Sequence, residues 1–182
     1  MIGLAARNAQ RLGLHKDPSY FNYSEWVSEW RRRLWNQLIL LNEKAISLQG
    51  AISILEFAWD TQLPGNSNDE AWNTSPLAKP SDAPVPTDIF SQMTFTLLKR
   101  AVLAVLCPLR QSLRSRPYAQ QLRHIEVGRK RTKTFFAAVM DDMKPLAAFV
   151  DAVVDIEFRI LKLMAGEALI RFGDPLPTFR FE

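Results

Sequence analysis

A proline-rich segment in the middle of the chain limits what the chain can fold into. Residues 64–86 hold five prolines and Gly65 among asparagine, serine and aspartate residues. Proline lacks a backbone N–H and clashes with the preceding turn, so this segment cannot form a continuous helix or a central strand. We therefore predict an N-terminal helical half over residues 1–63, a proline-rich loop over 64–86 and a C-terminal helical half over 87–182.

Helical periodicity marks the N-terminal half. A first helix is expected from Ile2 to Leu12, with Gly13 as the left-handed residue that ends it. A longer helix follows, with Ser24 as its N-cap. Its apolar side chains recur every three or four residues, which predicts one buried stripe with Trp35 and Ile39 on its flank. The stripe comprises Trp26, Trp30, Leu34, Leu38, Leu41, Ala45 and Leu48.

The same period continues after the central loop. Thr87 can cap a helix that is expected to end or kink at Cys107-Pro108. A second helical region is predicted from Tyr118 to Met140, weakened in its middle by Gly128 and the charged run that follows it.

The last helix is expected to begin at Pro145, a favourable first-turn residue, and to end at Gly173. Its predicted buried stripe comprises Leu146, Phe149, Val153, Ile156, Ile160, Leu163 and Leu169. No segment alternates between apolar and polar residues with a period of two. The expected fold is therefore all-α, an antiparallel multi-helix array.

Composition excludes several classes of protein. The 182 residues include one cysteine and two histidines, with a net charge of +4. One cysteine excludes a disulfide framework and any zinc site built from several thiolates, so we expect no metal and no cofactor. The longest uncharged apolar run, from Ala101 to Leu109, is too short to span a bilayer.

The reactive side chains form no catalytic pattern. His15 and His124 lie far apart in sequence and belong to no metal-binding motif, so loop or exposed helix positions are expected. Cys107 has apolar neighbours, which favours an inert thiol in the core. The pair Asp141-Asp142 has no matching acidic cluster, which favours a solvated turn. Since no acid, base and nucleophile can be assembled, we expect no catalytic residues and no enzyme.

Two sets of residues leave alternatives open. Trp26, Trp30 and Trp35 could stack on a ligand, although tryptophans at helical spacing are more often part of a core. Arg31, Arg32 and Arg33 could bind phosphate, or they could pair with Glu29 and Asp17. Structural pairing is the interpretation that we favour, and the sequence identifies no ligand-binding or DNA-binding residue.

A basic segment lies in the C-terminal half. Ten basic residues and one acidic residue, Glu126, lie between Lys99 and Lys133. The cluster of Arg129, Lys130, Arg131 and Lys133 could be a nuclear-import signal or a nucleic-acid patch, and a solvated helix face is the alternative.

Three stretches of the N-terminal half resemble the fungal-specific transcription factor domain, the middle homology region of fungal zinc-cluster regulators. The stretch Ala5–Ser19 is similar to the family's small-residue helix that runs into Leu-Gly-Leu-His-basic-Asp-Pro-Ser. Glu29–Trp35 resembles its Glu-x-Arg-Arg-Arg-Leu-Trp helix. Leu63-Pro64, with Asn66 and Asp69 after it, is similar to its Leu-Pro-x-Asn-x-x-Asp segment.

The resemblance implies an all-α scaffold, a nuclear location and a role in effector response, partner contact or restraint of activation. The family's DNA-reading module is a six-cysteine cluster with two zinc ions, which one cysteine cannot build. Another departure is Gln49-Gly50-Ala51-Ile52, where family members usually have Gly-Arg-Pro.

The start of the chain also differs from the family. Met1 lies where the family would be in mid-domain, so Leu4 and Leu12 are expected to lack the helices that normally cover them. We expect a truncated gene model, a fragment or a shortened paralogue.

These features lead to one main hypothesis and one alternative. The first is a regulatory domain without its own zinc cluster, which forms a homodimer or a heterodimer with a full-length regulator. The alternative is a helical small-molecule-binding or protein-interaction module with a tryptophan-lined pocket beside Arg31–Arg33 and no transcriptional role.

Overall fold

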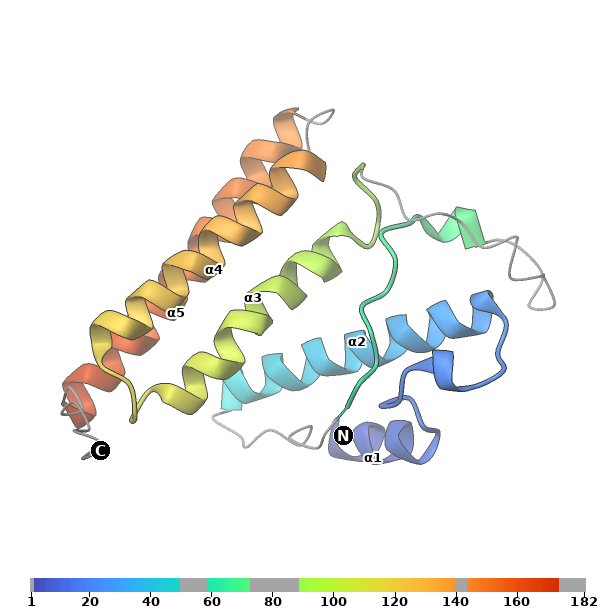
Figure 1. Ribbon diagram of the computed structural model, residues 1–182, viewed down its shortest axis with the longest axis horizontal. Helices are drawn as coiled ribbons and strands as arrows, with labels where there is room; N and C mark the ends of the chain where they lie inside the picture. Colours follow the sequence, from blue (N-terminus) through green and yellow to red (C-terminus); the bar gives the residue numbers. More distant parts are fainter. Residues whose placement is uncertain (1, 50–58, 73–88, 140–143, 174–182) are drawn as a thin grey trace, which may run out of the picture. The chain divides into compact units, whose positions relative to one another are not determined.

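The computed structural model is all-α, as the sequence predicts (Figure 1). It describes residues 2–49, 59–72, 89–139 and 144–173. The chain divides into two compact units, residues 1–97 and 98–182. None of the helices in the described ranges has an apolar stretch long enough to cross a bilayer.

The first unit is built around one long helix. Helix α1 (Ile2–Arg11) and the 3₁₀ helix η1 (Pro18–Tyr20) pack against helix α2 (Glu25–Gln49). An extended segment from residue 59 leads to a second 3₁₀ helix, η2 (Asp69–Trp72).

The predicted helix ends are confirmed in this unit. Gly13 has a φ of 68° and closes α1, because its N–H donates to the carbonyl of Gln10 and the N–H of Leu14 donates to that of Ala9. At the start of α2, Ser24 Oγ accepts a hydrogen bond from the N–H of Val27, as an N-cap does.

The buried face of α2 is not the predicted one. Trp35 and Ile39 are buried, whereas Leu34 and Leu41 are more than half exposed. The core therefore lies on what the sequence suggested was a flank. The reason is that polar side chains are buried on α2 together with Trp35: Ser28, Glu29, Arg33, Asn36 and Asn42.

Helix α3 (Thr94–Ser112) begins later and extends further than expected. Residues 89–93 are not helical, because Ser91 and Thr94 form a reciprocal cap: Ser91 Oγ accepts from the N–H of Met93, and Thr94 Oγ1 accepts from the N–H of Ser91. The helix does not end at Pro108. Leu109 directly after it is fully buried, and this packing offsets the one backbone hydrogen bond that proline cannot make.

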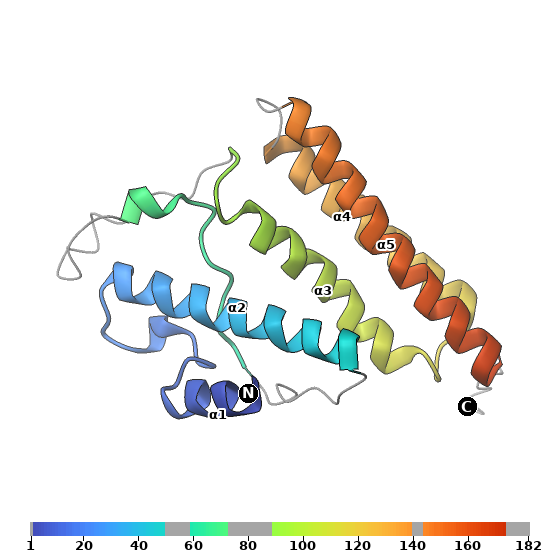
Figure 2. The same ribbon diagram turned by 180° about the vertical axis from the view of Figure 1, so that it is seen from behind.

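The second unit contains a helical hairpin. Helix α4 (Tyr118–Val139) and helix α5 (Lys144–Phe172) run side by side and antiparallel (Figures 1 and 2). Gly128 does not weaken α4. An added Cβ at Gly128 would lie within 3.3 Å of Val105 on α3 and Phe158 on α5, so the missing side chain is what lets the three helices approach.

The sequence also predicted the wrong buried face for α5. The buried residues of this helix are Val150, Val154, Phe158, Leu161, Ala165 and Ala168. Phe149, Ile156, Ile160 and Leu163, which the sequence placed in the core, are exposed. Both sets satisfy a helical period, because α5 is apolar on two opposite faces. Gly173, with a φ of 73°, ends the helix as predicted.

Four predicted features lie wholly or partly outside the described residues: residues 50–52 of the departure from the family, residues 73–86 of the proline-rich loop, the Thr87 cap, and Asp141-Asp142.

Candidate functional site

The most densely connected part of the first unit is centred on Arg33. Its Nε donates to Glu29 Oε1 at 2.8 Å, one turn earlier on α2. Its Nη2 donates to both the carbonyl oxygen and Oγ of Ser67, each at 3.1 Å. Its Nη1 is paired with Asp69 of η2. Glu29 and Arg33 are almost completely buried, so their charges compensate each other in a region from which water is excluded.

Glu29 has a second partner in the extended segment. Both of its carboxylate oxygens accept from the N–H of Gly65 at 3.1 Å. Ser67 Oγ also accepts from the indole N–H of Trp72 at 2.7 Å. The Glu29–Arg33 pair therefore fixes the path of residues 65–72 along α2.

Asp17 and Arg32 form a second ion pair beside the first. Arg32 Nε and Nη2 donate to Asp17 Oδ2 and Oδ1 at 3.1 and 2.9 Å, a two-pronged geometry that suits a carboxylate. The same carboxylate accepts from the N–H groups of Ser19 at 3.0 Å and Gln62 at 2.8 Å. Asp17 thus caps η1 and joins it to α2 and to the extended segment.

Burial by itself would raise the pKa of Asp17, since it disfavours the ionised carboxylate. The hydrogen bonds from Arg32, Gln62 and Ser19 outweigh it and hold the pKa of Asp17 well below its usual range. Asp17 is therefore ionised at any physiological pH. Its own N–H donates to Asp60 Oδ1 at 2.8 Å, which ties a second carboxylate to the group.

Asn66 connects the extended segment to the start of α3. Its Oδ1 accepts from the hydroxyl groups of Ser91 at 2.6 Å and Thr94 at 3.1 Å, and its Nδ2 donates to the carbonyl of Ile89 at 2.8 Å. The residues that carry the sequence resemblance are thus brought together in space. We call Asp17, Glu29, Arg32, Arg33 and Asp69 the arginine–carboxylate network.

The network decides between the two interpretations of the arginine run. Arg32 pairs with Asp17 and Arg33 with Glu29, which confirms the predicted structural pairing. Arg31 donates to the carbonyl of Leu12 at 2.8 Å and lies over the ring of Tyr23. Arg32 and Arg33 thus use their donors within the protein, whereas the buried Nε of Arg31 has no hydrogen-bond partner in the structure. Sequence reasoning missed the contributions of Asp60, Gly65 and Ser67, although the Leu-Pro-x-Asn-x-x-Asp pattern pointed to their segment.

The tryptophans of α2 are structural as well. Trp35 is fully buried, and its ring centroid lies 6.2 Å from that of His15. Trp26 donates its indole N–H to the carbonyl of Trp72 at 2.9 Å and lies against Trp30. The prediction that these side chains belong to the core is confirmed for Trp35, and Trp26 and Trp30 are half-buried at its edge.

The remaining candidates are dispersed. His15 lies in the loop after α1, and His124 lies on α4 with Nε2 3.3 Å from the carbonyl of Val105. Cys107 is exposed, so its predicted place in the core is wrong: it faces outward on α3 while its neighbours Leu106 and Leu109 are buried. Within the described ranges, no group of three or more histidine, cysteine or acidic residues is placed to hold a metal ion.

The basic cluster is divided between two faces of α4. Arg129 pairs with Asp155 of α5 at 2.7 Å, and Lys133 pairs with Asp151 and Asp155 at 2.9 Å. The hydrogen bonds that its ammonium group donates to these carboxylates raise the pKa of Lys133. Lys130 and Arg131 are exposed. Half of the cluster therefore holds the hairpin together.

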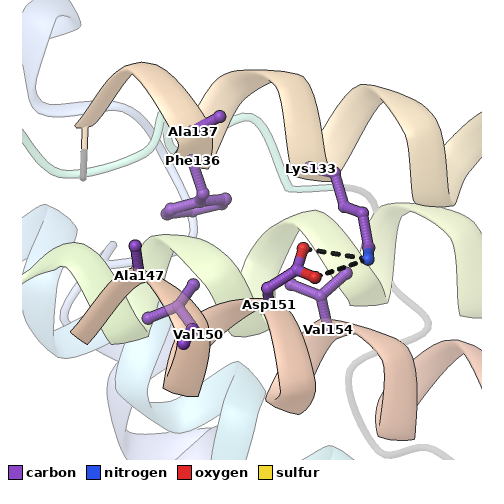
Figure 3. A pocket seen from close by; sticks show the side chains of 8 residues that line it. Lys133, Phe136, Ala137, Ala147, Val150, Asp151 and Val154 are labelled. Carbon is purple, nitrogen blue, oxygen red and sulfur yellow. Dashed lines mark hydrogen bonds and ion pairs between the residues drawn. The ribbon is translucent and has the colours of Figure 1, made fainter. Parts of the chain in front are cut away.

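A pocket of about 290 Å³ lies next to the Lys133–Asp151 pair (Figure 3). Phe136 and Ala137 of α4 face Ala147, Val150 and Val154 of α5 across it. Its lining is apolar except for that ion pair, whose charges already compensate each other.

The fungal specific transcription factor domain matches residues 1–126 of this chain. Among similar proteins is the aurofusarin cluster transcription factor aurR2 of Gibberella zeae, 35% identical over 91 residues. The pyriculol/pyriculariol biosynthesis cluster transcription factor 1 of Pyricularia oryzae is 34% identical over 101 residues. The transcription factor lepE of Aspergillus flavus is 35% identical over 107 residues.

These alignments cover 49%, 55% and 57% of this chain, but only 14%, 13% and 12% of the respective relatives. No solved structure matches the chain. The match to the family extends over well more than half of the 182 residues and includes every residue of the arginine–carboxylate network. The chain therefore belongs to the fungal specific transcription factor domain family.

Proposed function

We propose that this chain is a regulatory part of a fungal transcription regulator that works through protein contacts in the nucleus and does not itself read DNA. The observation that carries the proposal is the family match over residues 1–126, which includes the network. The single cysteine supports the second half of the proposal, since a two-zinc cluster needs six. Any zinc cluster of this kind would be held by residues outside these 182.

The names of the relatives indicate a class of genes for the proposed regulator to control. Two of the three are described as transcription factors of a cluster, one of them a biosynthesis cluster. We propose that the regulator in which this chain takes part controls a group of biosynthetic genes. A full-length regulator is the proposed partner through which the chain reaches a promoter, with a second copy as the simpler alternative.

The rigid connection of motif segments supports a scaffold and not a catalyst. The charged side chains of the network compensate one another, and none of them is left to act as a free acid, base or nucleophile. We favour this proposal over a ligand pocket beside Arg31–Arg33, because Arg32 and Arg33 donate to groups of the protein itself.

A tethering experiment tests the proposal. The chain is inserted between a heterologous DNA-binding domain and an activation domain, and reporter output is measured in a filamentous fungus. We expect a change of several fold relative to a flexible linker of equal length. Arg33→Ala should abolish the change because it disrupts the network, whereas Arg7→Ala, on the exposed side of α1, should preserve it.

Three outcomes would contradict parts of the proposal. Equal output from the inserted chain and the linker, at equal protein levels, would count against a regulatory role. A shift of promoter DNA by the purified chain alone would contradict the proposal that it does not read DNA. Exclusion of a fluorescent fusion from nuclei, in a strain that holds the full-length regulator, would contradict the proposed location.

A further inference from the structure

The basic cluster of α4, Arg129, Lys130, Arg131 and Lys133, is spread around the helix. Successive residues of an α-helix turn by about 100°, so Arg129 and Lys133, four residues apart, lie on one side of α4. Lys130 and Arg131 lie on other sides. A binding surface that approaches α4 from one direction therefore contacts only part of the cluster, whereas a linear import signal is read from several neighbouring cations at once.

Helix α5 binds the two cations that share a side of α4. Arg129 donates to Asp155 Oδ1 at 2.7 Å, and Lys133 pairs with both Asp151 and Asp155 at 2.9 Å. Figure 3 shows the contact between Lys133 and Asp151. Hydrogen bonds from Lys133 and Arg129 outweigh burial and lower the pKa of Asp155, so this carboxylate stays ionised near neutral pH. A receptor would have to displace these carboxylates before it could bind Arg129 or Lys133.

The packing of the hairpin also holds the backbone of this segment. Thr132, in the middle of the cluster, is buried, and its Oγ1 donates to the carbonyl of Gly128 at 2.9 Å. An added Cβ at Gly128 would lie 3.3 Å from Phe158, so α5 packs closely against the turn that precedes the cluster. Phe136, which follows the cluster, is buried as well. Residues 129–133 therefore cannot become extended unless α4 separates from α5.

Nucleic acid is the other partner that a basic cluster could bind, and the closed hairpin does not favour it. Contacts with phosphates require cations whose charge is not already compensated. Here three carboxylates of the hairpin lie within ion-pair distance of Arg129 or Lys133. An import signal is defined by a linear run of cations, so it keeps its meaning when the helices separate.

We propose that α5 masks an import signal. In the closed hairpin the basic cluster is withheld from nuclear import receptors, and it becomes a signal when α4 and α5 separate. The inference rests on the proposed function, since entry into the nucleus matters only for a chain that acts there. It implies that a chain with a closed hairpin enters nuclei together with a full-length regulator.

Nuclear import of the complete chain tests the proposal. The chain is fused to a tandem of fluorescent proteins that is too large to diffuse into nuclei, and its accumulation is measured in permeabilised cells with purified import receptors. The wild-type fusion should stay outside. Asp151→Asn with Asp155→Asn removes the carboxylates that α5 presents to Arg129 and Lys133, and the loss of these ion pairs should raise nuclear accumulation at least about fivefold.

A matched variant controls for the change in charge. Glu157→Gln with Glu167→Gln removes two negative charges from the same helix. The partners of these residues are Lys99 and Arg171, which lie outside the basic cluster. This fusion should therefore stay outside nuclei, as the wild-type fusion does.

The gain in accumulation should depend on the cluster itself. Adding Lys130→Ala and Arg131→Ala to the double Asn variant should return nuclear accumulation to the wild-type level. Circular dichroism shows whether the helices persist. If the double Asn variant loses helix content, Asp155→Asn alone, which removes a partner of both Arg129 and Lys133, is used in its place with an expected gain of about twofold.

Equal accumulation of the wild-type fusion and the folded Asn variant would overturn the proposal. A gain that the two Ala substitutions do not remove would also overturn it, as would a gain that nuclease treatment abolishes, which would show retention on nucleic acid. The assay contains no promoter and no full-length regulator, so these results leave the proposed transcriptional role standing. A reporter that does not respond in the tethering experiment would refute that role and leave the masking unaffected.

Discussion

Arg33 and Glu29 lie one turn apart on α2 and form an ion pair of 2.8 Å from which water is almost fully excluded. Neither residue could be buried alone, because an uncompensated charge in a protein interior is strongly unfavourable. Each also binds the extended segment, Arg33 through Ser67 and Glu29 through Gly65. The pair therefore supplies the hydrogen bonds that a strand or helix would otherwise provide for this irregular part of the chain.

Removal of Arg33 should destabilise the first unit severely. Arg33→Ala leaves Glu29 buried without its cation, and breaking a buried pair in this way costs about 3–5 kcal/mol. That is a large part of the 5–15 kcal/mol that stabilises an ordinary domain. Urea unfolding followed by tryptophan fluorescence measures the effect.

The control for this prediction is Arg7→Ala. Arg7 is exposed on α1, and surface substitutions of this kind change the free energy of unfolding by less than about 0.5 kcal/mol. An effect of Arg33→Ala as small as that of Arg7→Ala would show that the network contributes no stability.

Asp17 should make the free energy of unfolding depend on pH in the acid range. Its pKa is below the value of about 3.9 in an unfolded chain, so the unfolded state binds the proton more readily. The stabilisation is complete above about pH 5 and is lost as the pH falls through the unfolded pKa towards the lower pKa of the folded state. At pH 7 Asp17→Asn should lower the free energy of unfolding by about 2–3 kcal/mol.

Unfolding midpoints in urea at pH 7, 4 and 3 provide the measurement. The difference in urea midpoint between the wild-type chain and Asp17→Asn should become smaller as the pH decreases. A difference that is the same at pH 3 as at pH 7 would show that the carboxylate charge is not what stabilises η1 and its neighbours.

How far the sequence could predict this fold is best seen in α5. Its length, its start near Pro145 and its end at Gly173 follow from helix-forming and helix-ending residues, which act locally. Its buried face does not, because a helix with two apolar faces satisfies the same period on both. The ion pairs to α4 and the packing of Phe158 against Gly128 decide between the faces, and both join residues distant in sequence.

The arginine–carboxylate network likewise combines pairings that the sequence could predict with contacts that it could not. The pairings of Arg32 with Asp17 and of Arg33 with Glu29 were predictable, because opposite charges lay close in the chain or on one helix face. The contact of Arg33 with Asp69 was not, since 36 residues separate the two. Backbone partners such as the N–H groups of Gly65 and Gln62 leave no trace in residue type, so periodicity and charge could not reveal them.

Cys107 should be accessible to a thiol reagent in the folded chain. The sequence placed it in an apolar environment, but it is exposed on α3. A maleimide reagent should label it within about tenfold of the rate in urea, since a buried thiol would react only after the domain opened. Mass spectrometry follows the label, and a native rate suppressed by a thousandfold would show that the thiol is buried.

Gly128 should tolerate no side chain while Val105 stays in place. A Cβ at this position would lie 2.3 Å from Val105 Cγ2, and valine has little rotamer freedom to move away. Alanine favours a helix by up to about 1 kcal/mol over glycine, but overpacking costs about 1–3 kcal/mol, so Gly128→Ala should be destabilising.

In a Val105→Ala background the clash is relieved, and the two substitutions should couple by about 1 kcal/mol or more in a double-mutant cycle. Gly166→Ala on α5 is the matched control: outside its own helix, the nearest described atom to the added Cβ is Tyr118 Oη at 3.9 Å, so the substitution should be neutral or stabilising. Equal effects of Gly128→Ala and Gly166→Ala on urea unfolding would mean that α3, α4 and α5 do not meet at Gly128.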